Sequence, residues 1–206
     1  MWEIQEALRE RILAGDETAE HVLFVEHEPV ITLGRSADQR HVLLPANDLR
    51  ARGIEVVSSS RGGDVTYHGP GQLVVYPVVR LRAGVLDHVV TVGTSVASVL
   101  AQHGIAAEWR RDPAGVWVKK AKIAACGVHV RQRVAIHGLA LNVTIEPLAS
   151  FACIVPCGLS LGVTSMAVEL ASEPPPLPEL CKSIAETLCR SWSRTPLCSC
   201  DRMLAR

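Results

Sequence analysis

The sequence is poor in aromatic residues and carries no net charge. Aromatic side chains make up only 4% of the 206 residues, so the core has to be built mainly from Val, Leu, Ile and Ala. Lys plus Arg and Asp plus Glu each count 21, which argues against bulk electrostatic binding to nucleic acid or to an anionic membrane. Hydrophobic residues reach 48%, which excludes a disordered or low-complexity chain.

The chain also lacks a long apolar run, a basic-then-apolar leader and an even number of cysteines. No run approaches the roughly 20 residues of a membrane span. Seven cysteines without a secretion signal disfavour a disulfide framework, and the Cys198-Ser199-Cys200 pair has no His near it to complete a zinc site. These features predict a cytoplasmic protein whose partners include no membrane and no nucleic acid.

Hydrophobic periodicity predicts a mixture of helices and short strands. Ile4, Leu8 and Ile12 recur at steps of four and predict one apolar helical stripe. Residues 73–79 are apolar on both parities, so this strand should be buried on both faces, and Pro77 implies an edge position or a bulge. Further strands are expected at 21–26, 30–33, 54–57, 107–110, 115–118, 122–130 and 134–143, and further helices at 45–52, 88–103 and 180–192.

Hairpins and crossovers both occur in this order of elements. The pattern predicts an α+β fold with a mixed, largely antiparallel sheet and flanking helices. Residues 58–71 and 147–165 are expected to be loops or irregular segments. We expect a single domain over residues 16–192 and a C-terminal tail over residues 193–206.

One glycine-rich segment stands out between two expected strands. Residues 60–72 read Ser-Arg-Gly-Gly-Asp-Val-Thr-Tyr-His-Gly-Pro-Gly-Gln. Glycines let a ligand approach the backbone and expose N–H groups, and Arg61 is suited to hold an anion. A glycine-rich hairpin loop without any ligand fits the same composition.

Lys122 has an unusual position for a lysine. If residues 122–130 form a strand, Lys122 shares a face with Ala124, Cys126 and Val128, which is otherwise apolar. A lysine held away from water gives up its proton more readily and becomes a usable base. The alternative is a lysine at a strand end whose ammonium reaches out to water.

Two further residues have a context that bears on chemistry. Cys157 sits between Pro156 and Gly158 in an irregular segment, a better place for an exposed nucleophile than for a core residue. His137 shares its strand parity with Leu139 and other apolar residues. A lone His on such a face is more often a hydrogen-bonded core residue than a catalytic one.

These segments resemble the conserved blocks of a known enzyme family. Residues 61–77 resemble the signature of the lipoyl(octanoyl) transferases. The segments 122–125, 137–143, Pro156-Cys157-Gly158 and Thr164-Ser165 resemble further blocks, in the same order and at comparable spacing. The resemblance runs from roughly residue 16 to residue 192.

The resemblance implies the fold of the biotin and lipoate ligase catalytic domain and an acyl transfer without any cofactor. A family member takes octanoyl from octanoyl-acyl carrier protein and holds it as a thioester on a cysteine that matches Cys157. It then delivers the group to a lysine of the lipoyl domains of 2-oxoacid dehydrogenase complexes or of the glycine-cleavage H protein. The family lysine that works with the cysteine matches Lys122, and the substrate-contacting positions match Arg61, Gly62, Gly63, Asp64, Val65, Thr66, Tyr67, His68, Ala125, Cys126, Gly127, Gly138, Leu139 and Ala140.

Two related activities remain alternatives. An ATP-dependent lipoate or biotin ligase shares the implied fold and uses a lysine in the matching strand, but it needs no cysteine. An octanoyl amidotransferase acting between lipoyl domains also uses a cysteine and differs mainly in its donor. One departure from the family pattern is Cys126, where a larger aliphatic residue is expected.

Overall fold

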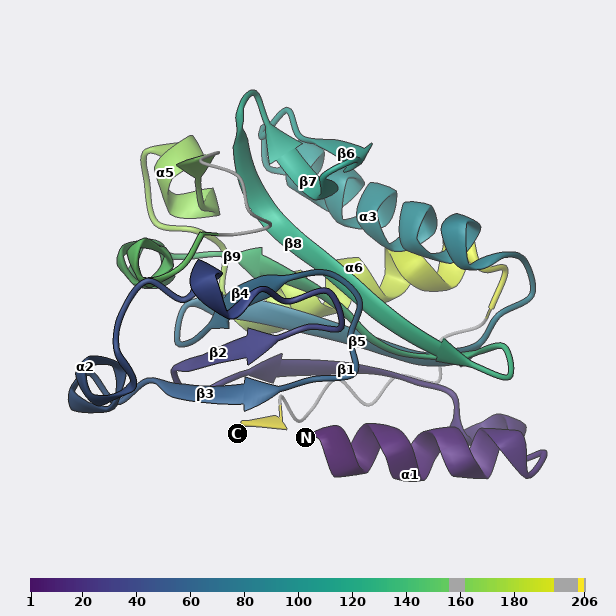
Figure 1. Ribbon diagram of the computed structural model, residues 1–206. Coiled ribbons are helices and arrows are strands. Elements are labelled where there is room, and N and C mark those ends of the chain that lie inside the picture. Colours follow the sequence, from purple (N-terminus) through teal and green to yellow (C-terminus); the bar gives the residue numbers. More distant parts are fainter. Residues whose placement is uncertain (156–161, 195–203, 206) are drawn as a thin grey trace.

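A small β-sheet lies over one face of a large one, and two long helices cover the other face of the large sheet (Figure 1). The structure is a computed structural model, and it describes residues 1–155, 162–194 and the backbone of 204–205. The two helices are α3 (Val85–Gln102) and α6 (Leu177–Ser191). The α+β fold predicted from the sequence is confirmed.

The large sheet is antiparallel except at two short strands. Its path is β11 (Leu204–Ala205), β1 (His21–Glu26), β5 (Gln72–Arg80), β9 (Val134–Asn142), β8 (Ala121–Arg131), β7 (Ala114–Val118) and β6 (Glu108–Arg111). The pair β1/β11 is parallel, and so is β10 (Gly162–Val163) on β8. The strands predicted at 122–130 and 134–143 are confirmed as β8 and β9, which form a hairpin with Gln132 and Arg133 at its turn in the left-handed conformation.

The main core fills the space between the large sheet and the helices. Val92, Val96 and Leu100 of α3 pack there against α6 and the central strands. By length and apolar composition alone α3 is able to cross a membrane, but these side chains are fully buried inside the protein. The helix is therefore a core element of this fold.

The small sheet has the order β3 (Glu55–Ser58), β2 (Val30–Leu33) and β4 (Val65–His68). Strand β4 lies within the segment that the sequence predicted to be a loop, so that expectation is wrong. Val65 and Tyr67 pack into a separate core with Ile31, Leu49 and other apolar residues. A strand of four residues between glycines is too short for its alternation to be recognised.

The remaining elements are short connections around this frame, apart from one helix at the N-terminus. Residues 147–155 and 162–165, expected to be irregular, contain a helical turn and strand β10. The N-terminal helix is α1 (Trp2–Leu13), and the short elements are η1 (Glu17–Ala19), η2 (Gln39–His41), α2 (Ala46–Ala51), α4 (Glu146–Ser150), η3 (Phe151–Cys153) and α5 (Met166–Leu170).

Helix α1 buries polar residues where its pattern predicted an apolar stripe. Gln5, Arg9 and Ile12 are buried, whereas Ile4 is 42% exposed. The stripe prediction is thus wrong at Ile4, whereas Leu8 is half-buried against the same core as Ile12. Gln5 is buried because its side chain has a specific backbone partner in β9.

That partner is the amide of His137, which lies opposite Pro77. Pairing between β5 and β9 stops after Val75 and resumes at Val79, so Pro77 sits at an interruption inside a central strand. The predicted edge position is therefore wrong. The register of the two strands is the same before and after the interruption, so it contains no extra residue and is not the predicted bulge either. The His137 amide donates to Gln5 Oε1 at 2.7 Å, which satisfies a buried N–H that the ladder leaves unpaired.

Strands β5 and β9 approach each other closely at Gly138, next to this interruption. A Cβ built there would lie 2.1 Å from the Val75 carbonyl oxygen, which is backbone and has little room to shift. We predict that Gly138→Ala lowers the free energy of unfolding by about 1–3 kcal/mol or more, because it overpacks the sheet. Chemical denaturation measures this loss.

The matched control for this prediction is Gly162→Ala. A Cβ at Gly162 would meet only the Ala121 Cβ, at 3.8 Å, which is an ordinary contact. If both variants unfold at the same denaturant concentration as the parent protein, the close approach at Gly138 is not a constraint on the fold.

Candidate active site

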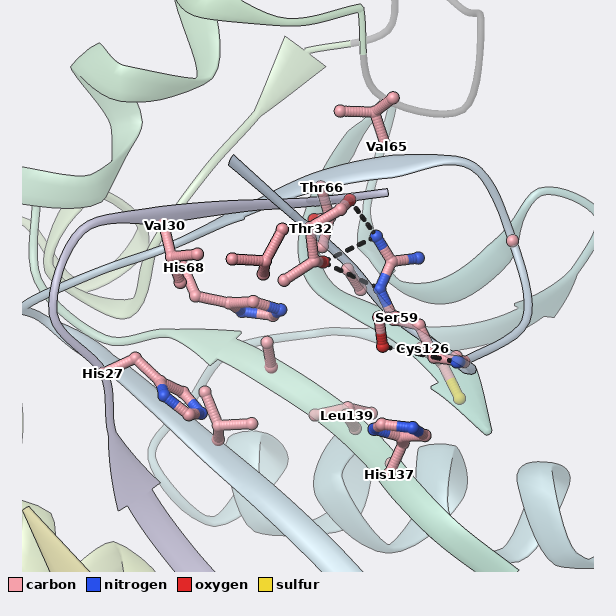
Figure 2. Close-up of a pocket in the computed structure, with 18 of the residues that line it drawn as sticks. His27, Val30, Thr32, Ser59, Val65, Thr66, His68, Cys126, His137 and Leu139 are labelled. Carbon is pink, nitrogen blue, oxygen red and sulfur yellow. Dashed lines mark hydrogen bonds between the residues drawn. The ribbon is translucent and has the colours of Figure 1, made fainter. Parts of the chain in front are cut away.

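A cavity of about 720 Å³ lies between the two sheets. Strands β2, β3 and β4 form one wall, and β5, β7, β8 and β9 form the other. The N-terminal turn of α1 contributes Met1, Trp2 and Gln5 to its lining. Figure 2 shows His27, His68 and His137 among the side chains around this space.

Arg61 binds the glycine-rich loop to the small sheet. Its guanidinium donates to Thr32 Oγ1 at 2.9 and 2.7 Å, to the Thr32 carbonyl at 2.5 Å and to the Gly62 carbonyl at 3.1 Å (Figure 2). Arg61 is only 9% exposed. These donors are committed to protein acceptors, so the guanidinium positions the loop as well as lining the cavity.

The same loop rests directly on the large sheet at a glycine. The Gly62 amide donates to the Val128 carbonyl at 2.9 Å. A Cβ at Gly127 would lie 2.7 Å from the Gly62 carbonyl oxygen. Only a glycine in β8 therefore permits this contact, which joins the two walls of the cavity.

Asp64 connects the cavity wall to the chain that leads toward Cys157. Its carboxylate accepts from the Asp38 amide at 3.0 Å and pairs with His41 Nδ1 at 2.5 Å. The His41 carbonyl in turn accepts from the Val155 amide at 2.8 Å. Val155 is therefore anchored to the loop around Asp64 through His41.

Lys122 belongs to a β-bulge. Trp117 of β7 pairs with Lys122 and Val116 pairs with Ala124, so that Ile123 is one extra residue in β8. The extra residue reverses the alternation of the strand at this point. Side chains before and after the bulge therefore lie on faces that simple parity does not predict.

The bulge places Lys122 on the cavity side of the sheet. Lys122 is 7% exposed and lines the cavity, whereas Ala124 packs into the core beneath α3 and α6. The predicted burial is confirmed, and the predicted shared face with Ala124 is wrong. The ammonium donates to the Ala114 carbonyl at 3.1 Å and lies 5.0 Å from the centre of the Trp117 ring.

Cys126 is the cysteine of the described cavity wall. Burial raises the pKa of its thiol to about 12, against the opposing influence of the Lys122 charge. A thiol with this pKa stays protonated near neutral pH and is a poor nucleophile. Cys126 also packs against the main core.

Three neutral histidines line the cavity. Burial lowers the pKa of His27 and of His137 to about 4, and the pKa of His68 to about 3. His27 Nε2 lies 2.8 Å from the Tyr76 hydroxyl, and His68 Nδ1 lies 3.1 Å from Gln72 Oε1. Over the described ranges 1–155 and 162–194, no group of three His, Cys, Asp or Glu side chains is placed to hold a metal.

His137 faces the cavity although its parity predicted the opposite face. Leu139 and Leu141 of the same parity pack under α3 and α6, but His137 has a φ of 61°. This left-handed backbone turns the imidazole toward the cavity, where its Nε2 lies 2.9 Å from Ser60 Oγ. The residue is buried and hydrogen-bonded, as predicted, but on the cavity wall.

The comparison with known proteins identifies the family. The model of the family described as lipoyl protein ligase A/B catalytic domain matches residues 1–189. The chain belongs to this family.

The chain is also similar to curated octanoyltransferases. The chain is 43% identical over 203 residues to an octanoyltransferase of Chloroflexus aggregans, covering 95% of this chain and 90% of the relative. It is 45% identical over 168 residues to an octanoyltransferase of Solibacter usitatus, covering 80% of this chain and 76% of the relative.

Solved structures share the fold at low sequence identity. A bipartite lipoate protein ligase from Thermoplasma acidophilum superposes with a TM-score of 0.73 at 14% identity, covering 98% of this chain and 82% of that chain. A biotin protein ligase from Aquifex aeolicus has a TM-score of 0.53 at 14% identity, covering 80% of this chain and 70% of that chain. The predicted ligase-like architecture is therefore confirmed.

The cavity gathers most of the residues predicted for the site. Gly62 and Tyr67 do not line it, because Gly62 faces β8 and Tyr67 packs against Phe151 on the far side of the small sheet. Cys157 lies outside the described residues. Those that line the cavity are Arg61, Gly63, Asp64, Val65, Thr66, His68, Lys122, Ala125, Cys126, Gly127, Gly138, Leu139 and Ala140.

The sequence pattern does not identify several of the residues that line the cavity. The sequence pattern places His27 in a connection between two expected strands and Trp117 in a short strand, and neither position indicates a site. Gln5 and Thr32 lie far from any recognised block, and only their contacts reveal them. The sequence signal for these four residues is weak, because each is only a polar or aromatic residue inside or beside an otherwise apolar segment.

The buried histidines predict a pH-dependent stability. In the unfolded chain a histidine titrates near pH 6.5, whereas the pKa of His27, His88 and His137 is about 4 in the folded protein and that of His68 about 3. The unfolded state therefore binds more protons in this window. The free energy of unfolding should fall as pH drops from about 6.5 to about 4, by up to about 1.4 kcal/mol per pH unit for each histidine.

Urea denaturation across this pH range checks the prediction. The stability should be level between about pH 7 and pH 8, where these histidines are neutral in both states. A stability that also remains level down to about pH 5 would show that the four imidazoles are charged in the folded protein or accessible to water.

Proposed function

We propose that this protein is an octanoyltransferase of protein lipoylation. It moves an octanoyl group from octanoyl-acyl carrier protein to a lysine of a lipoyl domain, through a thioester on Cys157. The observation that carries the proposal is the identity of 43% with an octanoyltransferase over 95% of this chain. Lys122 on the wall of a large cavity supports it.

The cavity has the size and polarity that an acyl substrate needs. Its volume of about 720 Å³ lies within the ~300–1,000 Å³ typical of small-molecule sites. Val74, Leu139 and Ala140 give part of the lining an apolar surface. Such a surface accommodates an octanoyl chain and excludes water, which would otherwise hydrolyse a thioester.

The first half-reaction acylates the enzyme. The Cys157 thiol gives its proton to Lys122, and the thiolate attacks the carbonyl carbon of the octanoyl thioester. A carbon–sulfur bond to Cys157 forms, and the bond to the phosphopantetheine sulfur breaks. The departing thiolate takes a proton from the Lys122 ammonium, which leaves Lys122 neutral.

The second half-reaction transfers the group. The amine of the acceptor lysine attacks the acyl-enzyme, an amide bond forms, and the bond to the Cys157 sulfur breaks. Neutral Lys122 takes the proton that the amine loses and passes it to the departing Cys157 thiolate, which restores the thiol and the neutral lysine of the starting state. Neither half-reaction consumes ATP, since the acyl group arrives as a thioester.

The contacts on both sides of the Cys157 segment support this pairing. On one side the Val155 amide donates to the His41 carbonyl, and on the other side Val163 pairs with Lys122 itself. Cys157 is two residues from Val155, a covalent distance of at most ~7 Å between Cα atoms. The chain that carries the proposed nucleophile therefore begins and ends beside the cavity.

The partners and compartment extend the same proposal. Lipoyl domains are the acceptor class, and we assign those of 2-oxoacid dehydrogenase complexes and of the glycine-cleavage H protein. The transferase acts in the cytoplasm, where acyl carrier protein supplies the donor. Residues 16–192 form the core of its catalytic domain, to which α1 adds part of the cavity lining, and residues 193–206 form a tail.

Acylation without ATP tests the reaction class. We predict that the protein incubated with octanoyl-acyl carrier protein gains the mass of one octanoyl group, and that peptide mapping locates it on Cys157. Cys157→Ser should give no hydroxylamine-labile adduct. Cys189→Ser, in α6 and away from the cavity, is the matched control and should acylate normally.

The same experiment separates the rival activities. Absence of an adduct, together with product from free octanoate and ATP, would assign the protein to the ligases. An adduct that forms from an octanoylated lipoyl domain but not from the carrier protein would assign it to the amidotransferases.

Lys122 is expected to be essential for turnover. Lys122→Met keeps much of the side-chain volume beside Trp117 but removes the proton carrier, so kcat should fall by about 10²–10⁴-fold, a typical loss for a general acid–base. Lys182→Met, on the exposed side of α6, is the matched control. Near-normal turnover of Lys122→Met at neutral pH would exclude the proposed role.

A further inference from the structure

A chain of buried polar groups joins His68 to the backbone of Lys122. His68 Nδ1 lies 3.1 Å from Gln72 Oε1, and Gln72 Nε2 donates to Asn142 Oδ1 at 2.9 Å. Asn142 Nδ2 donates to the Thr164 carbonyl at 2.9 Å, and the Thr164 amide donates to the Lys122 carbonyl at 3.0 Å. None of the residues in this chain is more than 8% exposed.

Two backbone carbonyls determine the direction of every bond in this chain. The Thr164 carbonyl only accepts, so the Asn142 amide nitrogen must face it and Asn142 Oδ1 must face Gln72. The Tyr67 carbonyl accepts from Gln72 Nε2 at 3.1 Å, which places the same nitrogen toward Asn142. Gln72 Oε1 is then left to face the imidazole of His68.

The tautomer of His68 follows from this arrangement. Gln72 Oε1 is an acceptor only, so His68 Nδ1 carries the proton and Nε2 has a free lone pair. Burial lowers the pKa of His68 to about 3, so the ring remains neutral at physiological pH. Within the part of the chain that the structure describes, no residue donates to Nε2, and His68 lines the cavity beside His27 (Figure 2).

We propose that His68 is a positioning residue whose Nε2 accepts a hydrogen bond from an N–H group of the substrate. The polar chain fixes the position of this acceptor relative to Lys122, because the other end of the chain binds the Lys122 carbonyl. The inference rests on the proposed function, which supplies two such groups. One is the amine of the acceptor lysine, and the other is the amide next to the thioester in the phosphopantetheine arm.

The chain also gives a role to three polar positions outside the predicted site. Gln72, Asn142 and Thr164 belong to three separate segments of the sequence, and each is at least nine-tenths buried. A buried amide is costly unless its partners are all present. Gln72 has a partner for its amide oxygen as well as for its amide nitrogen only when His68 Nδ1 carries a proton.

Nitrogen NMR of the ring atoms tests the tautomer in the unmodified protein. With ¹⁵N-labelled histidine, His68 should appear as the neutral Nδ1–H form throughout the pH range in which the protein is folded. Assignment uses the His68→Asn spectrum. Finding the Nε2–H tautomer or an imidazolium at neutral pH would overturn the inference, whatever the reaction proves to be.

A pair of substitutions separates the two ring nitrogens. His68→Asn places an amide nitrogen near the position of Nδ1 and keeps the bond to Gln72, but it has no acceptor at the Nε2 position. His68→Gln places an amide oxygen near Nε2 and gives up the donor to Gln72. We expect His68→Asn to slow one half-reaction about tenfold or more, the value of one hydrogen bond, with partial recovery in His68→Gln.

The half-reaction that slows identifies the substrate group. Slower formation of the octanoyl adduct points to the phosphopantetheine amide, and slower transfer from the preformed adduct points to the acceptor lysine. The pH–rate profile of His68→Gln should keep the shape of the parent profile, because His68 does not ionise. His88→Asn, a buried histidine stacked on Trp192 outside the cavity, controls for loss of an imidazole.

The outcomes distinguish this inference from the proposed function. If the parent protein forms no adduct without ATP, the proposed function fails, while the NMR result still decides the tautomer. If the parent forms the adduct and His68→Asn matches it in both half-reactions, the function stands and the role of His68 is wrong.

Discussion

The contact between the glycine-rich loop and the large sheet is the constraint on which the site depends. The Gly62 amide binds the Val128 carbonyl, and Gly127 leaves no side chain between the two backbones. Arg61, next to Gly62, fastens the same loop to Thr32 of the small sheet. A cavity between two sheets requires both walls to be held at a set distance. These contacts hold the two walls at that distance beside the glycine-rich loop.

Much of the frame was predictable because its central strands and long helices are apolar segments that stand out from the polar turns between them. The order of the elements and their bounds agree with the sequence pattern wherever a segment has one apolar face or two, as in β5 and α3. The site was less predictable, since its main features depend on departures from that pattern. Ile123 is an extra residue that reverses the face of Lys122, and the left-handed φ of His137 turns its ring to the cavity.

The polar burial in α1 shows another limit of periodicity. Gln5 is buried because Pro77, 72 positions further along the chain, interrupts the ladder opposite His137 and leaves its amide without a strand partner. No local window contains both ends of that interaction. A composition-based core assignment selects Ile4 instead, which the structure leaves 42% exposed. The hydrogen bond that satisfies an amide left unpaired by an irregular backbone therefore depends on tertiary contacts, which sequence spacing does not reveal.

The fold alone does not determine the chemistry of this family. Structures that share it at 12–14% identity include lipoate and biotin ligases, so the difference must lie in particular side chains. In this protein the polar chain from His68 to Lys122 joins strands β4, β5, β8 and β9 to the segment after β10. It links the wall that would receive the acyl substrate to the residue that would move the proton. A reaction in two half-steps needs the same groups in the same places twice. A buried chain of hydrogen bonds provides that rigidity without a metal ligand or a covalent cross-link among its members.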